Sequence, residues 1–235
     1  MIKFLERIIP YACIAGKARI WYIHLNPTYN ILMIKYSDTF PVGAYAVNCS
    51  IVQTEKDVFV IDPGSEAAAI LNALKEHDLV PTAILLTHGH FDHIGAVNVL
   101  QTAFPSLPVY VGAKDVAVLT HPMNQCPPEY PPIAKPSNIR IADDGNGPVG
   151  IDVIPTPGHT PGGVCYYFKD SAQLYSGDTL FAGSVGRTDF PGGDMATLLD
   201  SLKRLTVLPD KTNIVPGHGP ETTIGDEKDG NMFLQ

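Results

Sequence analysis

The sequence predicts an α/β fold in which helices cover layers of β-sheet and a functional site lies at one edge of the sheets. Two observations support this prediction. Short apolar runs rich in β-branched residues alternate along the chain with segments of helical periodicity. Several of the apolar runs also end in a histidine or an aspartate, so that polar residues collect where strands end.

The first elements follow this alternation closely. Residues 44–54 and 57–64 are apolar runs separated by a short polar segment, which predicts a β-hairpin. Residues 65–79 carry apolar residues at helical spacing, and Ser65 is the expected N-cap of that helix. Residues 82–88 are apolar up to a terminal Thr-His pair, as expected of a buried strand that ends at a sheet edge.

The rest of the chain repeats the pattern around a proline-rich segment. Residues 121–138 contain six prolines, which predicts a long surface loop because proline interrupts both helices and strands. The other expected elements are strands over 108–113, 151–159, 163–170, 172–178 and 213–219, and helices over 93–104 and 194–205.

The composition is that of an ordinary soluble globular protein. Of 235 residues, 45% are hydrophobic and 17% are charged, and the formal net charge is −8. This acidic balance argues against a nucleic-acid partner, and no apolar run reaches the roughly 18 residues of a membrane span. The four cysteines form no CxxC pair, as expected of reduced thiols in a cytoplasmic protein. The sequence does not indicate an oligomeric state.

The N-terminal segment differs from the rest of the chain. Residues 1–32 are apolar and aromatic but are interrupted by charges and prolines, and they lack the uninterrupted apolar core of a signal peptide. We interpret them as an extension, and residues 33–235 as one globular domain. Met33 is an alternative start of translation, and the residues alone do not decide between the two.

Side chains that can bind metal ions are concentrated in the segment LLTHGHFDHIGA, residues 85–96. A single histidine is more often a structural residue, but five of the eight histidines lie in three glycine-flanked segments at strand ends. Imidazole and carboxylate ligands together suit zinc, iron or manganese. Seven candidates are too many for one tetrahedral ion and indicate two ions that share a carboxylate. The candidates are His88, His90, Asp92, His93, His159, Asp178 and His218.

The run from Thr87 to Gly95, THGHFDHIG, resembles the signature of the metallo-β-lactamase-fold hydrolases. Further matches lie before and after it in the family's order, in the segments VIDPG, TPGHTPG, SGDTLF and VPGHGP. The resemblance covers roughly residues 40 to 235 and implies a four-layer αββα sandwich with a binuclear metal site at the sheet edges. Residues 33–235 would accordingly form one metallo-β-lactamase-fold catalytic domain.

The resemblance also implies a role for each candidate. Asp178 would bridge two divalent metal ions, with zinc the expected metal and iron or manganese as alternatives. Asp92 would bind metal and act as the catalytic base, while Asp62 of VIDPG would orient the ligands without binding metal itself. The other ligands would form two groups: His88, His90 and His159 on one ion, and Asp92, His93 and His218 on the other.

Within this superfamily, the segment SGDTLFAGSVGRTDFPGGD is similar to the glyoxalase II and persulfide dioxygenase branch. The whole pattern is most similar to the short glyoxalase II-like hydrolases. Lactamases of the cysteine-containing type use a thiol ligand, whereas here Asp178 holds the bridging position and Cys165 falls within an expected strand. These features argue against antibiotic hydrolysis as the main activity.

The resemblance to glyoxalase II predicts hydrolysis of a small thioester, such as an S-lactoylglutathione-like substrate, by a metal-bridging hydroxide. Arg187 matches a basic glutathione contact of that branch and is the predicted substrate-binding residue, but it could instead pair with Asp189 or Asp194. Asp189 and Pro220 stand where the branch has aromatic residues. The acyl group and the thiol carrier therefore stay open.

Two alternatives to thioester hydrolysis also stay open. A persulfide dioxygenase of the same fold would use one iron held by two histidines and a carboxylate. A metal-binding scaffold without turnover is the second alternative. The segment VPGHGP favours the hydrolase over the dioxygenase, and the complete set of seven candidate ligands argues against a scaffold.

Overall fold

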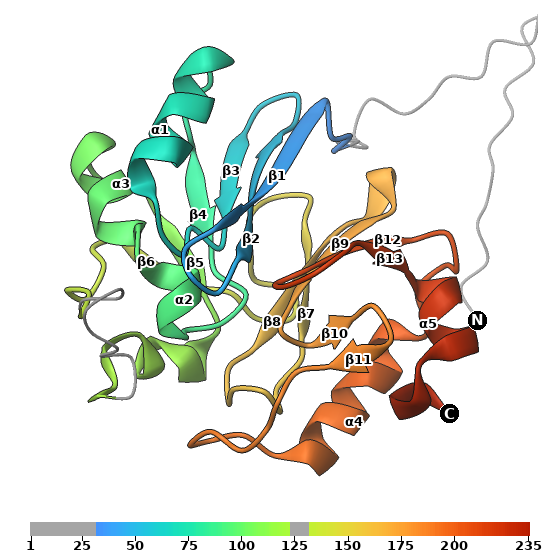
Figure 1. The fold of residues 1–235 in the computed structure, drawn as a ribbon. Coiled ribbons are helices and arrows are strands. Elements are labelled where there is room, and N and C mark those ends of the chain that lie inside the picture. Colours follow the sequence, from blue (N-terminus) through green and yellow to red (C-terminus); the bar gives the residue numbers. More distant parts are fainter. Residues whose placement is uncertain (1–31, 123–131) are drawn as a thin grey trace, which may run out of the picture. The chain divides into compact units, whose positions relative to one another are not determined.

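Two β-sheets lie face to face, and helices cover the outer face of each sheet (Figure 1). The structure is a computed structural model that describes residues 32–122 and 132–235. All but the last residue of the predicted N-terminal extension lie outside the described residues, as does the centre of the proline-rich loop.

The first sheet has six strands in the order β1-β2-β3-β4-β5-β6. These strands are β1 (Tyr36–Val42), β2 (Val47–Gln53), β3 (Val58–Ile61), β4 (Ala83–Leu85), β5 (Val109–Val111) and β6 (Ile139–Ile141). Strands β1, β2 and β3 pair antiparallel, which confirms the predicted hairpin, and β3 to β6 pair parallel. The carboxyl ends of the parallel strands therefore meet at one edge of the sheet.

The second sheet has five strands in the order β13-β12-β9-β8-β7. These strands are β7 (Asp152–Pro155), β8 (Val164–Phe168), β9 (Gln173–Gly177), β12 (Asn213–Pro216) and β13 (Thr222–Thr223). Strand β12 runs parallel to β9, and β7 has the same direction because the pairs β7–β8 and β8–β9 are both antiparallel. A two-stranded ribbon of β10 (Leu180–Phe181) and β11 (Ser184–Val185) follows β9.

The helices divide between the two outer faces. They are α1 (Ala67–Glu76), α2 (Phe91–Ile94), α3 (Val97–Ala103), α4 (Met195–Leu205) and α5 (Ile224–Gly230), with 3-10 turns η1 (Ala113–Val116), η2 (Val118–Thr120), η4 (Lys169–Ser171) and η5 (Met232–Leu234). Helices α1 and α3 pack on the first sheet, and α4 and α5 pack on the second (Figure 1). Across the described ranges, no helix has both the length and the apolar character needed to span a membrane.

Strand β8 shows how one strand contributes to two layers of the core. Val164, Tyr166 and Phe168 belong to the core between the two sheets. Cys165 and Tyr167 belong to the core between the second sheet and α4. Successive side chains of a strand point to opposite faces, which is why an uninterrupted apolar run is needed here.

Strand β3 divides in the same way on the first sheet. Phe59 and Ile61 join the core between the sheets, whereas Val58 and Val60 pack with Ile70 of α1 on the outer side. The order helix, sheet, sheet, helix confirms the predicted αββα sandwich.

Ser65 is not the N-cap of α1, and that prediction was wrong. The helix begins at Ala67, and the preceding Glu66 has a left-handed φ of 51° with no side-chain cap. Gly64 packs so closely on the Asp92 carbonyl that a Cβ there would overlap it. This contact fixes the turn before the helix, so the helix begins at Ala67 and not directly after Ser65.

The predicted helix over 93–104 is interrupted in the structure and forms α2 and α3. The N–H of Ala96 donates to the carbonyl oxygen of Pro63 at 2.9 Å, so this amide serves a tertiary contact. A Cβ at Gly95 would overlap the carbonyl oxygen of Gly64, which shows how closely the two segments approach. At this interruption, Gly95 and Ala96 pack against Pro63 and Gly64, which follow β3.

Tyr166 joins the two sheets through its hydroxyl group. Its side chain is fully buried, and the hydroxyl donates to the carbonyl oxygen of Leu86 at 3.0 Å. Leu86 immediately follows β4 and lies two residues before His88, the first of the candidate ligands. The bond therefore holds the strand end that carries the candidate ligands.

We predict that Tyr166→Phe lowers the free energy of unfolding by about 1–2 kcal/mol, because the buried Leu86 carbonyl loses this donor. Urea denaturation of the metal-free protein measures the change. Tyr167→Phe is the matched control, since the Tyr167 hydroxyl makes no hydrogen bond to the described residues. The control should change the free energy by less than about 0.5 kcal/mol. Equal losses in the two variants would contradict the role given to the Tyr166 hydroxyl.

Candidate metal centre

The seven predicted ligands come together at the carboxyl ends of strands from both sheets. His88 and His90 follow β4, and Asp92 and His93 lie on the short helix α2 immediately after them. The other three follow strands of the second sheet: His159 after β7, Asp178 after β9 and His218 after β12. The two sheets therefore each contribute part of one cluster.

Three overlapping groups of three side chains have the geometry of metal sites. Each residue of a group offers one ligand atom within 4.8 Å of the others. His88, His90 and His159 form the three-histidine group, and Asp92, His93 and His218 form the mixed group. The third group is His88, His93 and Asp178, which takes one imidazole from each of the other two.

Hydrogen bonds on the outer nitrogens fix the orientation of the imidazoles. Nδ1–H of His159 donates to the Arg187 carbonyl at 2.6 Å, and Nδ1–H of His218 donates to the Tyr45 carbonyl at 2.9 Å. Since a carbonyl oxygen can only accept, Nδ1 of each ring must carry the proton. The Nε2 atoms of both rings are left to face the cluster.

Asp62 and Thr87 orient the remaining buried rings. The Thr87 hydroxyl donates to Asp62 Oδ2 at 2.6 Å, and Nδ1–H of His93 donates to the same oxygen at 2.9 Å. The single hydroxyl proton of Thr87 is used in this way, so its oxygen accepts from Nδ1 of His88 at 3.1 Å. Asp62 thus contacts the outer side of the cluster, at the place predicted for a residue that orients the ligands.

Asp178 lies between the two groups. Its Oδ1 is 3.4 Å from Nε2 of His93, and its Oδ2 is 3.5 Å from Nε2 of His159 and 3.6 Å from Nε2 of His218. One carboxylate therefore reaches members of both groups. This is the position from which a carboxylate can bridge two ions.

Buried polar atoms in the cluster lack partners among the described residues. Nε2 of His88, Nε2 of His93 and Oδ1 of Asp178 are buried and accept or donate no hydrogen bond there. A buried polar atom without a partner is costly, and native structures satisfy nearly all of them. Divalent cations bound to these atoms would remove that cost, so the side chains present fit a metal centre.

Electrostatics divide the histidines into two kinds. Burial lowers the pKa of His90 to about 4, and burial with the neighbouring His93 lowers the pKa of His88 well below its usual value. Burial also acts to lower the pKa of His93, but the charges of Asp178, Asp62 and Asp92 outweigh it and raise that pKa. The carboxylates thus favour the protonated, positively charged form of His93, at the place where a cation would bind.

The carboxylates of the cluster stay ionised. Burial acts to raise the pKa values of Asp178 and Asp92, but His93 and the other neighbouring histidines together outweigh it, and the pKa of each carboxylate is lowered. An ionised carboxylate can bind a cation or accept a proton. The two carboxylates are therefore in the form that binds metal.

Arg187 pairs with Asp189 rather than with Asp194. Its Nε and Nη2 atoms each donate to the Asp189 carboxylate at 2.7 Å, and the guanidinium carbon lies 4.1 Å from the centre of the Phe190 ring. Asp194 instead caps α4 by accepting from the Thr197 N–H at 2.7 Å. Of the two pairing partners named from the sequence, the structure has Asp189.

Phe190 places this ion pair at the rim of the candidate centre. Its ring centre is 5.5 Å from that of His90. Both partners of the pair are more than half exposed, with side-chain exposed fractions of 57% for Arg187 and 65% for Asp189. A charged pair in solvent therefore borders the three-histidine group.

The sequence prediction missed Asp115. This residue is fully buried on η1, and its carboxylate accepts hydrogen bonds from segments on both sides of the three-histidine group. In the sequence, Asp115 is a single acidic residue between Lys114 and the segment VAVLT, and no motif or spacing rule marks it.

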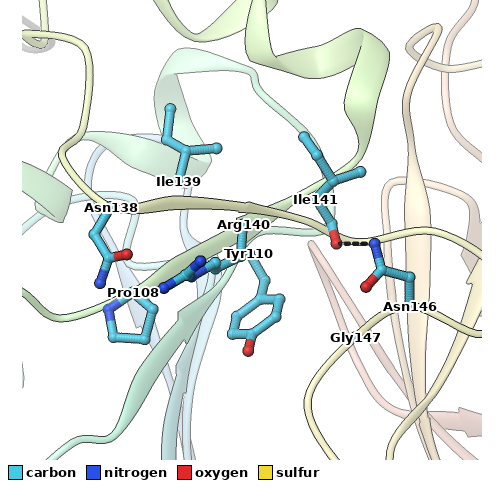
Figure 2. Close-up of a pocket in the computed structure, with 8 residues that line it drawn as sticks. All are labelled: Pro108, Tyr110, Asn138, Ile139, Arg140, Ile141, Asn146 and Gly147. Carbon is cyan, nitrogen blue, oxygen red and sulfur yellow. Dashed lines mark hydrogen bonds between the residues drawn. The ribbon is translucent and has the colours of Figure 1, made fainter.

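A hollow of about 600 Å³ lies away from these ligands (Figure 2). Pro108 and Asn138 border it at the amino ends of β5 and β6, which is the opposite edge of the first sheet from His88. Arg140 is the charged side chain among its lining residues, and the Asn146 amide within it donates to the Ile141 carbonyl at 3.1 Å. The hollow contains none of the candidate ligands.

An αββα sandwich with two ligand groups at its strand ends defines a class of metal-dependent enzymes. The family model described as the metallo-beta-lactamase superfamily matches residues 42–218, and this chain belongs to that superfamily. A probable metallo-hydrolase of Bacillus subtilis, YqgX, is 40% identical over 201 residues, which are 83% of this chain and 95% of that protein. Hydroxyacylglutathione hydrolase GloC of Haemophilus influenzae is 35% identical over 209 residues, which are 84% of this chain and 97% of that protein.

Solved structures show the same fold. The BLEG-1 B3 metallo-beta-lactamase has a TM-score of 0.77 and 38% identity, covering 85% of this chain and 99% of that one. TTHA1623 in a di-iron-bound form has a TM-score of 0.74 and 41% identity, covering 84% of this chain and 100% of that one. ETHE1 from Myxococcus xanthus has a TM-score of 0.65 and 27% identity, covering 84% of this chain and 83% of that one. The fold and the superfamily predicted from the sequence are confirmed.

Proposed function

We propose that this metallo-hydrolase cleaves small thioesters with two divalent metal ions, for which zinc is the expected metal and iron or manganese are alternatives. The observation that carries the proposal is Asp178, whose carboxylate reaches both ligand groups. The similarity to GloC, a hydroxyacylglutathione hydrolase, supports the thioester class, and the di-iron-bound TTHA1623 supports two ions.

Bound divalent ions would polarise the thioester carbonyl and lower the pKa of a water toward neutrality. The residues of this chain supply the orientation and the proton transfer. Oδ2 of Asp92 is 3.4 Å from Nε2 of His218, and the lowered pKa of Asp92 keeps its carboxylate ionised and able to accept a proton. Asp92 is therefore the proposed catalytic base, and it would orient the attacking water toward the carbonyl carbon.

The closing steps of the reaction follow from the same atoms. Attack on the carbonyl forms a tetrahedral species, and its collapse breaks the bond between carbon and sulfur. The thiolate leaves and takes up a proton, for which protonated Asp92 is the nearby donor. Since no step needs a protein nucleophile, the chemistry depends on the two ligand groups remaining intact.

Two other activities have specific support and are outcomes of the same test. ETHE1 from Myxococcus xanthus shares the fold at 27% identity, which supports the iron-dependent persulfide dioxygenase alternative. BLEG-1 is a B3 metallo-beta-lactamase at 38% identity, so a β-lactam belongs among the substrates to be tried. The complete mixed group, with its own carboxylate and two imidazoles, favours a two-ion hydrolase over a one-iron oxygenase.

We predict that zinc-loaded protein hydrolyses S-lactoylglutathione or another acyl thioester, and that His90→Ala reduces kcat/KM at least about 100-fold by removing a metal ligand. The assay panel contains acyl thioesters, a persulfide with oxygen uptake recorded, and a β-lactam, each with zinc-, iron- and manganese-loaded protein. His77→Ala is the control, because His77 lies at the end of α1 and stacks on Tyr36. Thioesterase activity that survives in His90→Ala would contradict the proposal, as would turnover of only the persulfide or the β-lactam.

We also predict a charge effect at the rim. Asp189→Asn frees Arg187, so KM for the anionic S-lactoylglutathione should fall about two- to five-fold while a neutral thioester is unaffected, an effect of the size expected for an exposed ion pair. Raised salt should reduce the difference. Asp200→Asn removes the same charge from a pair with Lys203 on α4 and is the matched control. Equal KM changes for neutral and anionic substrates would contradict a substrate-binding role for Arg187.

A further inference from the structure

Asp115 is a buried carboxylate outside the predicted ligand set. It lies on η1, just after β5, and its exposed fraction is 0%. Oδ2 accepts from the Gly89 N–H and from the Thr160 hydroxyl, both at 2.8 Å, and Oδ1 accepts from the Gly162 N–H at 2.6 Å. A carboxylate with this many donors is held in one position, because each bond restricts it in a different direction.

The donors lie next to the members of the three-histidine group. Gly89 is the residue between His88 and His90, so its amide is part of the backbone that carries both rings. Thr160 directly follows His159, and Gly162 lies in the same turn. One carboxylate thus connects the ligand segment of the first sheet to the ligand segment of the second.

The ligand segment of the second sheet approaches η1 too closely for side chains to separate them. A Cβ at Gly112 would overlap the carbonyl oxygen of Gly162, and a Cβ at Gly162 would overlap the backbone nitrogen of Asp115. Glycine is therefore required at both positions. With the backbones in contact, the Asp115 carboxylate sets the distance between the two ligand segments.

We propose that Asp115 is a positioning residue for one ion only, the ion of the three-histidine group. The mixed group has its own support from Asp62, which accepts from Nδ1–H of His93. No hydrogen bond joins Asp115 to a member of the mixed group among the described residues. The inference rests on the proposed two-metal centre but not on the identity of the substrate.

Asp115→Asn tests the proposal with almost no change in volume. An amide presents an NH2 group where one carboxylate oxygen stood, so one of the three donors loses its acceptor and faces another donor. Zinc binding is measured by titration calorimetry and by metal content after dialysis. We expect one zinc ion to bind about 10- to 100-fold more weakly than in the wild type and the other to bind with unchanged affinity.

Glu227→Gln is the matched control. Glu227 is also buried, and its carboxylate accepts from the Gly183 N–H at 2.9 Å, the Thr222 hydroxyl at 2.7 Å and the Asn231 amide at 2.7 Å. The control loses one hydrogen bond of the same kind on α5, away from the ligands. We expect it to lower the thermal stability of the metal-free protein as Asp115→Asn does, while both zinc affinities stay at the wild-type value.

Thr160→Val is a second, milder variant, and it tests the same role if Asp115→Asn does not fold. It removes only the hydroxyl group that donates to Asp115. It should weaken the binding of the same single ion by a smaller factor, and cobalt(II) spectra of the loaded variants should change only for the ion of the three-histidine group. Two unchanged affinities, two equally weakened affinities, or the same loss in Glu227→Gln would each overturn the role of Asp115. A wild-type protein that binds fewer than two zinc ions would instead overturn the proposed two-metal centre.

Discussion

The fold depends on one electrostatic constraint, the burial of the Asp178 carboxylate among imidazoles. Its two oxygens lie 3.4–3.6 Å from Nε2 of His93, His159 and His218, and Oδ1 has no hydrogen-bond partner among the described residues. An ionised carboxylate in such a place is stable only with compensating positive charge. The segments that follow β3, β4, β7 and β12 supply either that charge or a group that orients it.

The surrounding shell of hydrogen bonds decides what the cluster can bind. In every ring except His90, the outer nitrogen is hydrogen-bonded to a carbonyl oxygen, to the Thr87 hydroxyl or to Asp62, so the inner nitrogen faces the space around Asp178. Nδ1 of His90 instead contacts Nε2 of His159 at 2.9 Å. Asp62 accepts from His93 and, through Thr87, also orients His88. Asp115 reaches the backbone beside the three-histidine group. Two buried carboxylates thus hold a centre that is assembled from both sheets.

The sequence was sufficient to predict which ligand-type residues lie together at the strand ends, because that depends on local motifs, whereas the four layers were implied by the family resemblance. The motif THGHFDHIG and its partner segments place ligand-type residues at strand ends, and apolar runs such as β8 indicate strands buried on both faces. Strand β1 was missed because its residues are mostly half-exposed and mixed in polarity, and α5 because it is short and rich in charges. Asp115 was missed for a different reason: its partners are 26 and 45–47 residues away, and only tertiary packing brings them together.

The central claim is that two metal ions share Asp178. Anomalous X-ray scattering from zinc-loaded crystals tests it directly, since it locates each ion without reference to activity. The account predicts two peaks on either side of the Asp178 carboxylate, one bound by the three-histidine group and the other by the mixed group. A single peak, or a second peak that does not contact Asp178, would contradict it.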